Sequence, residues 1–515
     1  MTTDQHHEGG SRPAISHNSD SLIAPPLYSD HFHYFQFFIS AGASNQGGEG
    51  WAQNSLNKWH FYTCPDLPMI RLTDEEERHV GFLLGTAIDD HGLLKHGAQI
   101  KLPRSATEAD SGFSDWLSTI RGRYVSFIDS PNVARFDLDP LGALAAVYSL
   151  DHPVIASTWS LIKNPSDEYL RAALKDPICT LACQSYPAGL TRTDDVARLL
   201  PNFALHTNTW RVQRHWPRPT DFEKTDDPNK ELQRASNEIR HIIDSLAEHY
   251  DIYLTLTGGL DSRLIAACTS KKALKRTQFV TFKYDDKLGD RIDCHISKLI
   301  AKKLGRPQTV INIEPASTQD SIDYLRRIGV SGGAGKASDF MNGAKKLNPQ
   351  RAFITGFSNT IRSIYGHYGS NQFERVEDSY DAAKLLQRCE LEGNARSKRA
   401  ISEWREGLKD YPIEMIPFLL YNEIRGGCWS SPHQYGITKF AATVIAFSSR
   451  PLERACIRLT KKALEDNNPG IIANATEEII KMNQPKLAEI SFNDFNGTRK
   501  LVRRLTYNRF WRIGK

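Results

Sequence analysis

Apolar residues follow a strand-like rhythm in the first part of the chain. Short apolar or alternating runs punctuated by turn residues are typical of β-strands. A helical stretch near Glu168–Leu174 and a strand pair within Phe203–Val212 follow them. We therefore predict a β-rich, layered α+β first part. The runs that carry this prediction are Tyr34–Ile39, Phe82–Gly85, Tyr124–Ile128, Ala145–Tyr148 and Val154–Ala156.

A different rhythm begins after residue 219, where helical and strand-like patterns alternate. Apolar residues recur at helical spacing from Leu232 to Leu246, through Cys268 and over Ile292–Ile300. Alternating helices and apolar strands predict a parallel α/β sheet covered on both faces, which binds ligands at the C-terminal ends of its strands. Residues 380–464 are predicted to be mostly helical. The predicted strands start at Ile252 and cover Phe279–Phe282, Thr309–Ile313 and Ala352–Gly356.

The chain of 515 residues is too long for one ordinary hydrophobic core. Residues 1–29 are rich in Ser, His, Pro and Gly, and we predict a disordered arm there. The proline-rich segment His215–Pro219 is the best candidate for a linker. The predicted domains are therefore 30–215 and 225–515.

The strongest chemical signal follows the strand that starts at Ile252. Thr257-Gly258-Gly259-Leu260-Asp261-Ser262 joins that strand to a helix. Glycines let consecutive N–H groups form a concave anion site at a helix N-terminus, and Thr257 and Ser262 add hydroxyl donors. Asp261 beside phosphates implies Mg²⁺, which bridges carboxylate and phosphate oxygens. The competing reading is a plain turn with an N-cap, but the strand before and the helix after the glycines favour a pyrophosphate site.

The turn resembles the PP-loop, SGGxDS, of ATP pyrophosphatases, with Thr257 in place of the first Ser. With the surrounding strands and the spacing of Asp293 to Leu304-Gly305, residues 225–515 resemble the synthetase domain of the asparagine synthetase superfamily, which includes beta-lactam synthetases and lasso-peptide cyclases. The resemblance implies that a carboxylate attacks ATP to give an acyl-adenylate and pyrophosphate, and that an amine then forms an amide. We expect the nucleotide to be held by Leu256, Thr257, Gly258, Gly259, Leu260, Asp261, Ser262, Thr281, Phe282 and Gly356.

The first part resembles the family's glutaminase-type domain through Gly122–Asp129, Asp139–Gly142 and Ile155–Ser157. That domain uses a cysteine that becomes the N-terminal residue after Met removal, whereas this sequence has Thr2 and places Cys64 far away. We therefore expect no glutaminase activity and a scaffolding role for this domain.

A second family loop, SGEGxDE, reads Thr355–Arg362 in this chain and carries no acid. Arg362 or Arg263 could neutralise phosphate or hold a substrate carboxylate, or each could form a structural ion pair. The family also uses a lysine near its C-terminal end in adenylation, and Lys481 and Lys486 are the candidates. Asp261, Arg263, Arg362, Lys481 and Lys486 are therefore the predicted catalytic residues, and Asp261 is the predicted metal ligand.

The segment Tyr421–Trp429 resembles a helix on the acceptor side of related synthetases. Glu423 and Arg425 could contact substrate there, or they could form a salt bridge at the edge of the core. The basic, apolar-interleaved tail from Arg499 to Lys515 could touch an anionic membrane surface or pack on the body as a helix. The scattered cysteines predict free thiols.

No apolar run is long enough to span a membrane, and the polar N-terminus gives the expectation of a cytoplasmic protein. A net charge of +5 does not indicate nucleic acid. We expect a ligase that uses ATP and Mg²⁺ to join small-molecule or peptide carboxylates and amines, as a monomer or a homodimer. The alternatives are an authentic asparagine synthetase, a non-catalytic nucleotide-binding protein and an RNA-modifying PP-loop enzyme.

Overall fold

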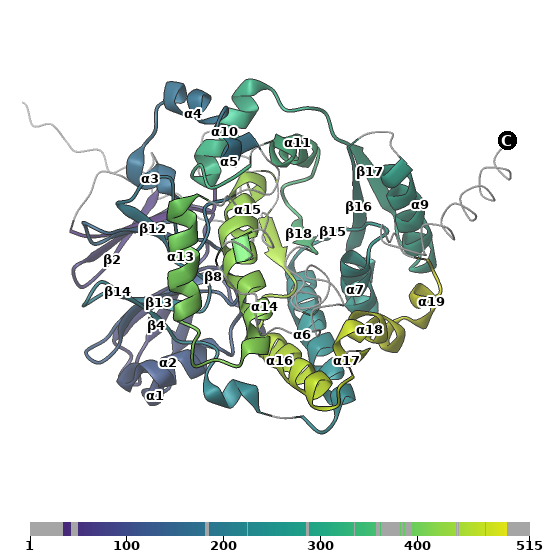
Figure 1. The fold of residues 1–515 in the computed structure, drawn as a ribbon, viewed down its shortest axis with the longest axis horizontal. Coiled ribbons are helices and arrows are strands. Elements are labelled where there is room, and N and C mark those ends of the chain that lie inside the picture. Colours follow the sequence, from purple (N-terminus) through teal and green to yellow (C-terminus); the bar gives the residue numbers. More distant parts are fainter. Residues whose placement is uncertain are drawn as a thin grey trace, which may run out of the picture.

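The computed structural model describes most of the chain between residues 34 and 491. The described residues are 34–42, 50–180, 185–223, 225–284, 288–333, 335–356, 361, 382, 385–386, 394–438, 440, 442–468 and 470–491. Antiparallel strands fill the first part, and a parallel sheet lies in the second (Figure 1). The chain therefore has the layered α/β architecture that the apolar patterns predict.

Two sheets form the first part of the molecule, and their neighbouring strands are antiparallel except for β4 and β7, which are parallel. The first has the order β12-β10-β11-β1-β3-β2, and the second has the order β14-β13-β9-β8-β5-β4-β7, with β6 paired to β5. Their bounds are β1 Phe37–Ala41, β2 Ala52–Leu56, β3 Trp59–Thr63, β4 Met69–Thr73, β5 His79–Asp89, β6 Gly92–Leu93, β7 Gln99–Lys101, β8 Arg121–Asp129, β9 Ala134–Leu138, β10 Val147–Ser149, β11 Val154–Ala156, β12 Val196–Arg198, β13 Phe203–His206 and β14 Arg211–Arg214.

Aromatic and aliphatic side chains fill the space between these two sheets. Phe37 and Phe61 of the first sheet share a core cluster with Phe82 and Phe127 of the second. The rings of Phe61 and Phe127 meet edge to face, with centroids 5.0 Å apart. Short helices cover the outer faces, so the first part has four layers. The helices of this part are α1 Arg104–Glu108, α2 Asp110–Leu117, α3 Trp159–Lys163, α4 Asp167–Ala173 and α5 Pro177–Thr180.

The third sheet has five strands in the order β17-β16-β15-β18-β19, and every neighbouring pair is parallel. Successive side chains of β15 alternate between faces: Ile252 and Leu254 join the core on one face, and Tyr253 joins the core on the other. Both faces are therefore buried, as the parallel sheet requires. The strands are β15 Ile252–Thr255, β16 Thr277–Lys283, β17 Gln308–Asn312, β18 Ala352–Thr355 and β19 Ala442–Ile445.

Helices cover the third sheet and connect it to the first part. The longest is α6, whose N-cap Asp227 accepts hydrogen bonds from the Asn229 and Lys230 amides and whose first position is Pro228. These elements are η1 Pro219–Phe222, α6 Pro228–His249, α7 Leu260–Cys268, α8 Lys271–Lys275, α9 Leu288–Lys303, α10 Thr318–Ile328, α11 Gly335–Ala344, α13 Ala395–Glu406, η4 Ile413–Met415, α14 Ile416–Leu419, η5 Leu420–Ser430, α15 Ser431–Thr438, α16 Arg450–Glu465, α17 Gly470–Ala473, α18 Ala475–Asn483 and α19 Pro485–Ala488.

Two helices of the second part pack closely on other elements. The αL residue Gly329, with φ 68°, ends α10, and a Cβ at this position would lie 2.8 Å from the Trp159 backbone nitrogen of α3. A Cβ on Gly436 of α15 would lie 2.0 Å from the Tyr324 ring of α10. Glycine therefore permits α3, α10 and α15 to approach one another directly.

The structure adds two features to the sequence-based picture. The mostly helical stretch of residues 380–464 contains β19, which completes the parallel sheet. The segment His215–Pro219, predicted as a linker, is packed rather than exposed, since Trp216 is 3% exposed and belongs to the main core of the second part. The free cysteines agree with the sequence: within the described residues Cys64, Cys179, Cys268, Cys294, Cys428 and Cys456 are unpaired thiols.

Candidate phosphate-binding site

The glycine turn lies where the order of the parallel strands reverses. The chain passes from β15 to β16 to β17 in one direction and then returns to β18 on the other side of β15. In open α/β sheets, ligands bind at the C-terminal ends of the strands that flank such a reversal. Gly258 and Gly259 follow β15, and Gly356 follows β18. The fold therefore brings the glycine turn and Gly356, at the start of the second predicted loop, to the position where a ligand is expected.

The turn itself is held by the hydroxyl groups at its two ends. Ser262 Oγ accepts a hydrogen bond from the Thr257 amide (3.0 Å) and lies 3.1 Å from Thr257 Oγ1. Thr257 Oγ1 in turn accepts a hydrogen bond from the Gly259 amide (3.2 Å). Gly259 precedes the first residue of α7 with extended backbone. The positive end of the α7 dipole therefore faces the turn.

The Gly258 amide of the turn already donates a hydrogen bond to a carboxylate. Asp293, from α9, accepts a hydrogen bond from the Gly258 amide at 3.2 Å. This amide thus points toward an anionic oxygen that comes from another element. The sequence pattern places Asp293 on the helix after the second strand, but it does not connect Asp293 with the turn. The spacing of acids on that helix is the signal that could have found it.

The end of β16 supports the turn from its other side. Thr281 is buried, and its hydroxyl donates to the Leu256 carbonyl (2.8 Å) and accepts from Gln308 Nε2 (2.8 Å). The ring of Phe282 packs on Phe340, with centroids 4.3 Å apart. The Thr281 hydroxyl and the Phe282 ring are therefore engaged with the protein, and their contact with a nucleotide stays a prediction.

Gly356 lies directly against the start of α7. A Cβ built on Gly356 would lie 3.4 Å from the Ser262 amide nitrogen and 3.6 Å from Asp261 Cβ. Leu256 is fully buried and Leu260 partly buried, so the Leu256 side chain belongs to the core. The predicted nucleotide residues from Leu256 to Ser262 and Gly356 are thus adjacent in space.

Arg263 is a buried cation that binds backbone carbonyls. Its guanidinium donates to Gly258 O of the turn (3.3 Å) and to Leu487 O, Ile490 O and Ser491 O of the segment that begins with α19. Burial lowers its pKa to about 10, so Arg263 remains charged at neutral pH. These contacts are those of a residue that fixes the turn to residues 487–491. A catalytic role for Arg263 stays a prediction.

The two candidate lysines lie on exposed surfaces near this segment. Lys481 forms an ion pair with Glu478 within α18 (2.6 Å), and Lys486 is exposed on α19. Helix α18 packs against α7, the helix that follows the glycine turn. Arg362, predicted from the second loop, lies outside the described residues. Catalytic roles for these three residues stay predictions.

The structure settles the position of Glu423. This residue lies on η5, which is wound as a π-helix, and is fully buried. Its carboxylate accepts hydrogen bonds from Arg214, Asn202 Nδ2 (2.7 Å) and Trp404 Nε1 (2.7 Å). Glu423 therefore forms a structural salt bridge. Arg425 instead stacks on Trp429, 4.1 Å from the ring centroid.

The site fits a nucleotide with magnesium better than a metal bound by protein alone. Magnesium is usually held by one or two carboxylates together with phosphate oxygens, and Asp261 and Asp293 are the acids at the turn. Among the described residues, no group of three or more His, Cys, Asp or Glu side chains is placed to hold a metal ion. The same part of the chain contains no helix long and apolar enough to cross a membrane.

Comparisons with known proteins give little further guidance. No family model matches the chain, and no curated protein matches it. Among solved structures, the chain is similar to the U34-tRNA thiolase NcsA from Methanococcus maripaludis, solved with its [4Fe-4S] cluster. The two are 14% identical, the match covers 52% of this chain and 86% of the thiolase, and the TM-score is 0.21. A likeness of that strength assigns neither fold nor function.

Proposed function

We propose that this protein is an ATP-dependent ligase that adenylates a substrate carboxylate, releases pyrophosphate and joins the acyl group to an amine. The observation that carries the proposal is the glycine turn at the strand reversal, with Gly258, Gly259 and Gly356 around the start of α7. Such a place combines backbone donors, a helix N-terminus and space for phosphate. The sequence resemblance to the asparagine synthetase superfamily supplies the reaction class.

The proposed reaction has two steps. A carboxylate oxygen of the substrate attacks the α-phosphorus of ATP, and the bond from that phosphorus to the β-phosphate oxygen breaks to release pyrophosphate. An amine nitrogen then attacks the acyl carbon, loses a proton and displaces AMP. When held by Asp261, magnesium would neutralise charge on the pyrophosphate leaving group.

The residues of the chain have separate tasks in this proposal. The amides of the turn and the Thr257 hydroxyl would bind phosphate oxygens and oppose the negative charge that develops on pyrophosphate. Asp261 would hold magnesium. Asp293, whose carboxylate now accepts from the Gly258 amide, would give up that amide to a phosphate oxygen and is available to the same cation.

Ammonia released from glutamine does not enter this proposal. Cys64 is fully buried, and burial followed by the nearby Asp66 charge raises its pKa to about 12. A thiol in that state is a poor nucleophile at neutral pH. We therefore expect an amine substrate, supplied directly or within the same molecule as the carboxylate.

The proposal can be tested by exchange of labelled pyrophosphate into ATP in the presence of magnesium and pools of carboxylates. We expect exchange with one pool, and its loss in Asp261→Asn. Glu314→Gln is the matched control, because Glu314 is an exposed acid paired with Lys346. ATP binding without exchange under any condition would favour a nucleotide-binding protein that has lost chemistry and would refute the ligase proposal.

A further inference from the structure

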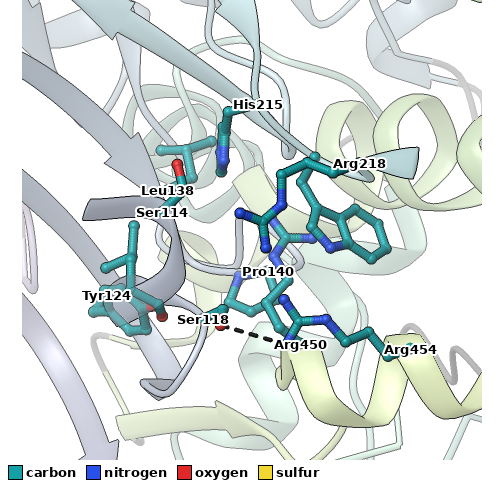
Figure 2. A pocket seen from close by; sticks show the side chains of 11 residues that line it. Ser114, Ser118, Tyr124, Leu138, Pro140, His215, Arg218, Arg450 and Arg454 are labelled. Atoms are coloured by element: carbon teal, nitrogen blue, oxygen red, sulfur yellow. Dashed lines mark hydrogen bonds between the residues drawn. The ribbon is translucent and has the colours of Figure 1, made fainter. Parts of the chain in front are cut away.

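A small cavity lies where the two parts of the molecule meet, away from the glycine turn. Its walls come from α2, from the strands β8 and β9, from the segment after β14 and from α16 (Figure 2). The lining residues are Ser114, Leu117, Ser118, Tyr124, Leu138, Pro140, His215, Trp216, Arg218, Arg450 and Arg454.

The cavity is lined by cations and by no acid. Figure 2 shows Arg218, Arg450 and Arg454 converging on one space beside His215. None of the described residues that line it is Asp or Glu. All three arginines pair with carboxylates of residues that do not line the cavity: Arg218 with Asp115 (2.7 Å), Arg450 with Glu453 (2.6 Å) and Arg454 with Asp221 (2.6 Å). The described residues of the cavity wall therefore carry three guanidinium groups and no carboxylate.

Two side-chain nitrogen atoms at this cavity make no hydrogen bond within the described part of the chain. Trp216 is 3% exposed, and its Nε1 makes no hydrogen bond. An indole N–H can only donate. His215 Nε2 also makes no hydrogen bond and lies 3.5 Å from an Asp137 oxygen that pairs with Arg135, but its role as donor or acceptor depends on the tautomer, so the Trp216 N–H is the donor that needs an acceptor. A buried donor without an acceptor costs about 1–3 kcal/mol, so an acceptor from outside the chain is expected there.

The cavity volume limits what that acceptor can be. The volume is about 10 Å³, which suits one water molecule or one ion of similar size. That size favours a ligand of one heavy atom over phosphate, sulfate or carboxylate, which have several. The ligand that suits this cavity is therefore a single atom that accepts hydrogen bonds from several directions.

We propose that this cavity binds a small monovalent anion of the halide type, chloride in a physiological setting. A water molecule needs acceptors for its own two hydrogens, and the lining side chains chiefly donate. Ser118 Oγ already accepts from Arg454 (3.4 Å) and Ser114 Oγ from Arg135 (3.1 Å). An anion accepts from the indole N–H and the guanidinium groups without that requirement.

The bound anion would join the two parts of the molecule. Arg450 and Arg454 belong to α16 of the second part, and Ser114 and Ser118 belong to or adjoin α2 of the first. Arg450 also stacks on Trp216, 4.3 Å from the ring centroid, which places the guanidinium beside the indole. Anion binding therefore stabilises the junction, independently of any nucleotide.

Bromide offers a direct test, because it replaces chloride and scatters X-rays anomalously. Crystals of the wild-type protein grown or soaked in bromide are expected to show an anomalous peak in this cavity. In solution, the midpoint of thermal unfolding is expected to rise by about 1–2 °C when chloride replaces gluconate at constant ionic strength. A peak and a rise would support the proposal.

The variant Trp216→Phe keeps the ring under Arg450 and removes its N–H group. We expect it to lose at least half of the chloride-dependent rise, whereas Trp116→Phe, on α2 but outside the cavity lining, keeps it. A cavity without an anomalous peak overturns the proposal in favour of water. An unchanged chloride response in Trp216→Phe also contradicts it. If Trp216→Phe does not fold, the bromide experiment on the wild type decides alone.

Discussion

Single residues at the glycine turn show how side chains hold a loop in place. Thr257 and Ser262 bond across the turn, and Arg263 binds the Gly258 carbonyl. The sequence predicts hydroxyl groups at these two positions as donors to phosphate, but it does not predict that they bond to each other across the turn. It does not predict that Arg263 binds three carbonyls of residues 487–491, which are more than 200 positions away.

We expect Arg263 to hold the glycine turn in place and to take no direct part in the reaction. Arg263→Met keeps the length of the side chain but leaves four carbonyls without their donor, so we expect a loss of about 2–4 kcal/mol in the free energy of unfolding. ATP affinity should fall as well, since residues 487–491 no longer hold the turn. Thermal unfolding and ATP titration measure both, with the exposed Arg291→Met as control. Loss of pyrophosphate exchange with unchanged stability and ATP affinity would show instead that Arg263 is catalytic.

Gly356 offers a way to obstruct the site without damaging the fold. A Cβ at this position meets Ser262 N at 3.4 Å and Asp261 Cβ at 3.6 Å, which is ordinary contact. We expect Gly356→Ala to leave the unfolding midpoint nearly unchanged and to weaken ATP binding by about tenfold or more. Gly407→Ala, where the nearest atom is also at 3.4 Å, is the matched control. Unchanged ATP affinity in Gly356→Ala would place the nucleotide elsewhere.

At the scale of elements, the sequence pattern predicts long amphipathic helices and buried parallel strands well. Helix α6 and strands β15 to β18 lie where the periodicity places them. Strand β19 was not predicted, because Ala442–Ile445 is short and lies among helices. This short apolar run becomes a strand by pairing with β18, and that pairing depends on the folded sheet. The sequence also does not predict the burial of Trp216, because a packed proline-rich segment and an exposed linker have the same composition.

The contact between α10 and α15 predicts how stability depends on pH. His433 is buried and bonded to the Tyr324 hydroxyl, and burial, followed by the charges of Arg425 and Arg198, lowers its pKa to about 3. The unfolded chain has a His pKa of about 6.5 and therefore binds the proton more readily. The stability contributed by neutral His433 is complete above pH 6.5 and is lost as the pH falls toward 3.

The variant His433→Gln isolates this effect, because its amide can bond Tyr324 but does not titrate. Between about pH 6 and 4 the wild type should lose up to about 1.4 kcal/mol per pH unit more than the variant. Chemical denaturation at several pH values measures the difference. Equal slopes for the two proteins would mean that His433 is not kept neutral in the folded state.

At the scale of the whole molecule, polar networks join the antiparallel sheets to the parallel one. Arg121 of β8 binds Glu238 of α6 (2.7 Å), and Arg123 donates to Thr438 and Thr443 (2.7 Å each). Glu423 gathers Asn202 and Arg214 from the first part and Trp404 from α13. The sequence predicts two parts, but it cannot reveal these networks, because their side chains are far apart along the chain.

The Glu423 network predicts that the junction is sensitive to loss of one charge. In Glu423→Gln, an amide nitrogen would face groups that all donate, and the buried Arg214 would lose its partner. We expect a loss of about 3 kcal/mol in the free energy of unfolding, measured by denaturant titration. The exposed Glu403→Gln is the control and should change little. A wild-type-like stability for Glu423→Gln would show that the network does not hold the junction.

The central claim is that ATP binds with its phosphates on the turn between β15 and α7. A crystal structure of the protein with magnesium and an ATP analogue that resists cleavage between the α- and β-phosphates tests it most directly. The account predicts phosphate oxygens on the Gly258 and Gly259 amides, magnesium on Asp261, and Asp293 displaced from the Gly258 amide. An analogue bound elsewhere, or Asp293 still bonded to Gly258 with the nucleotide present, would contradict it.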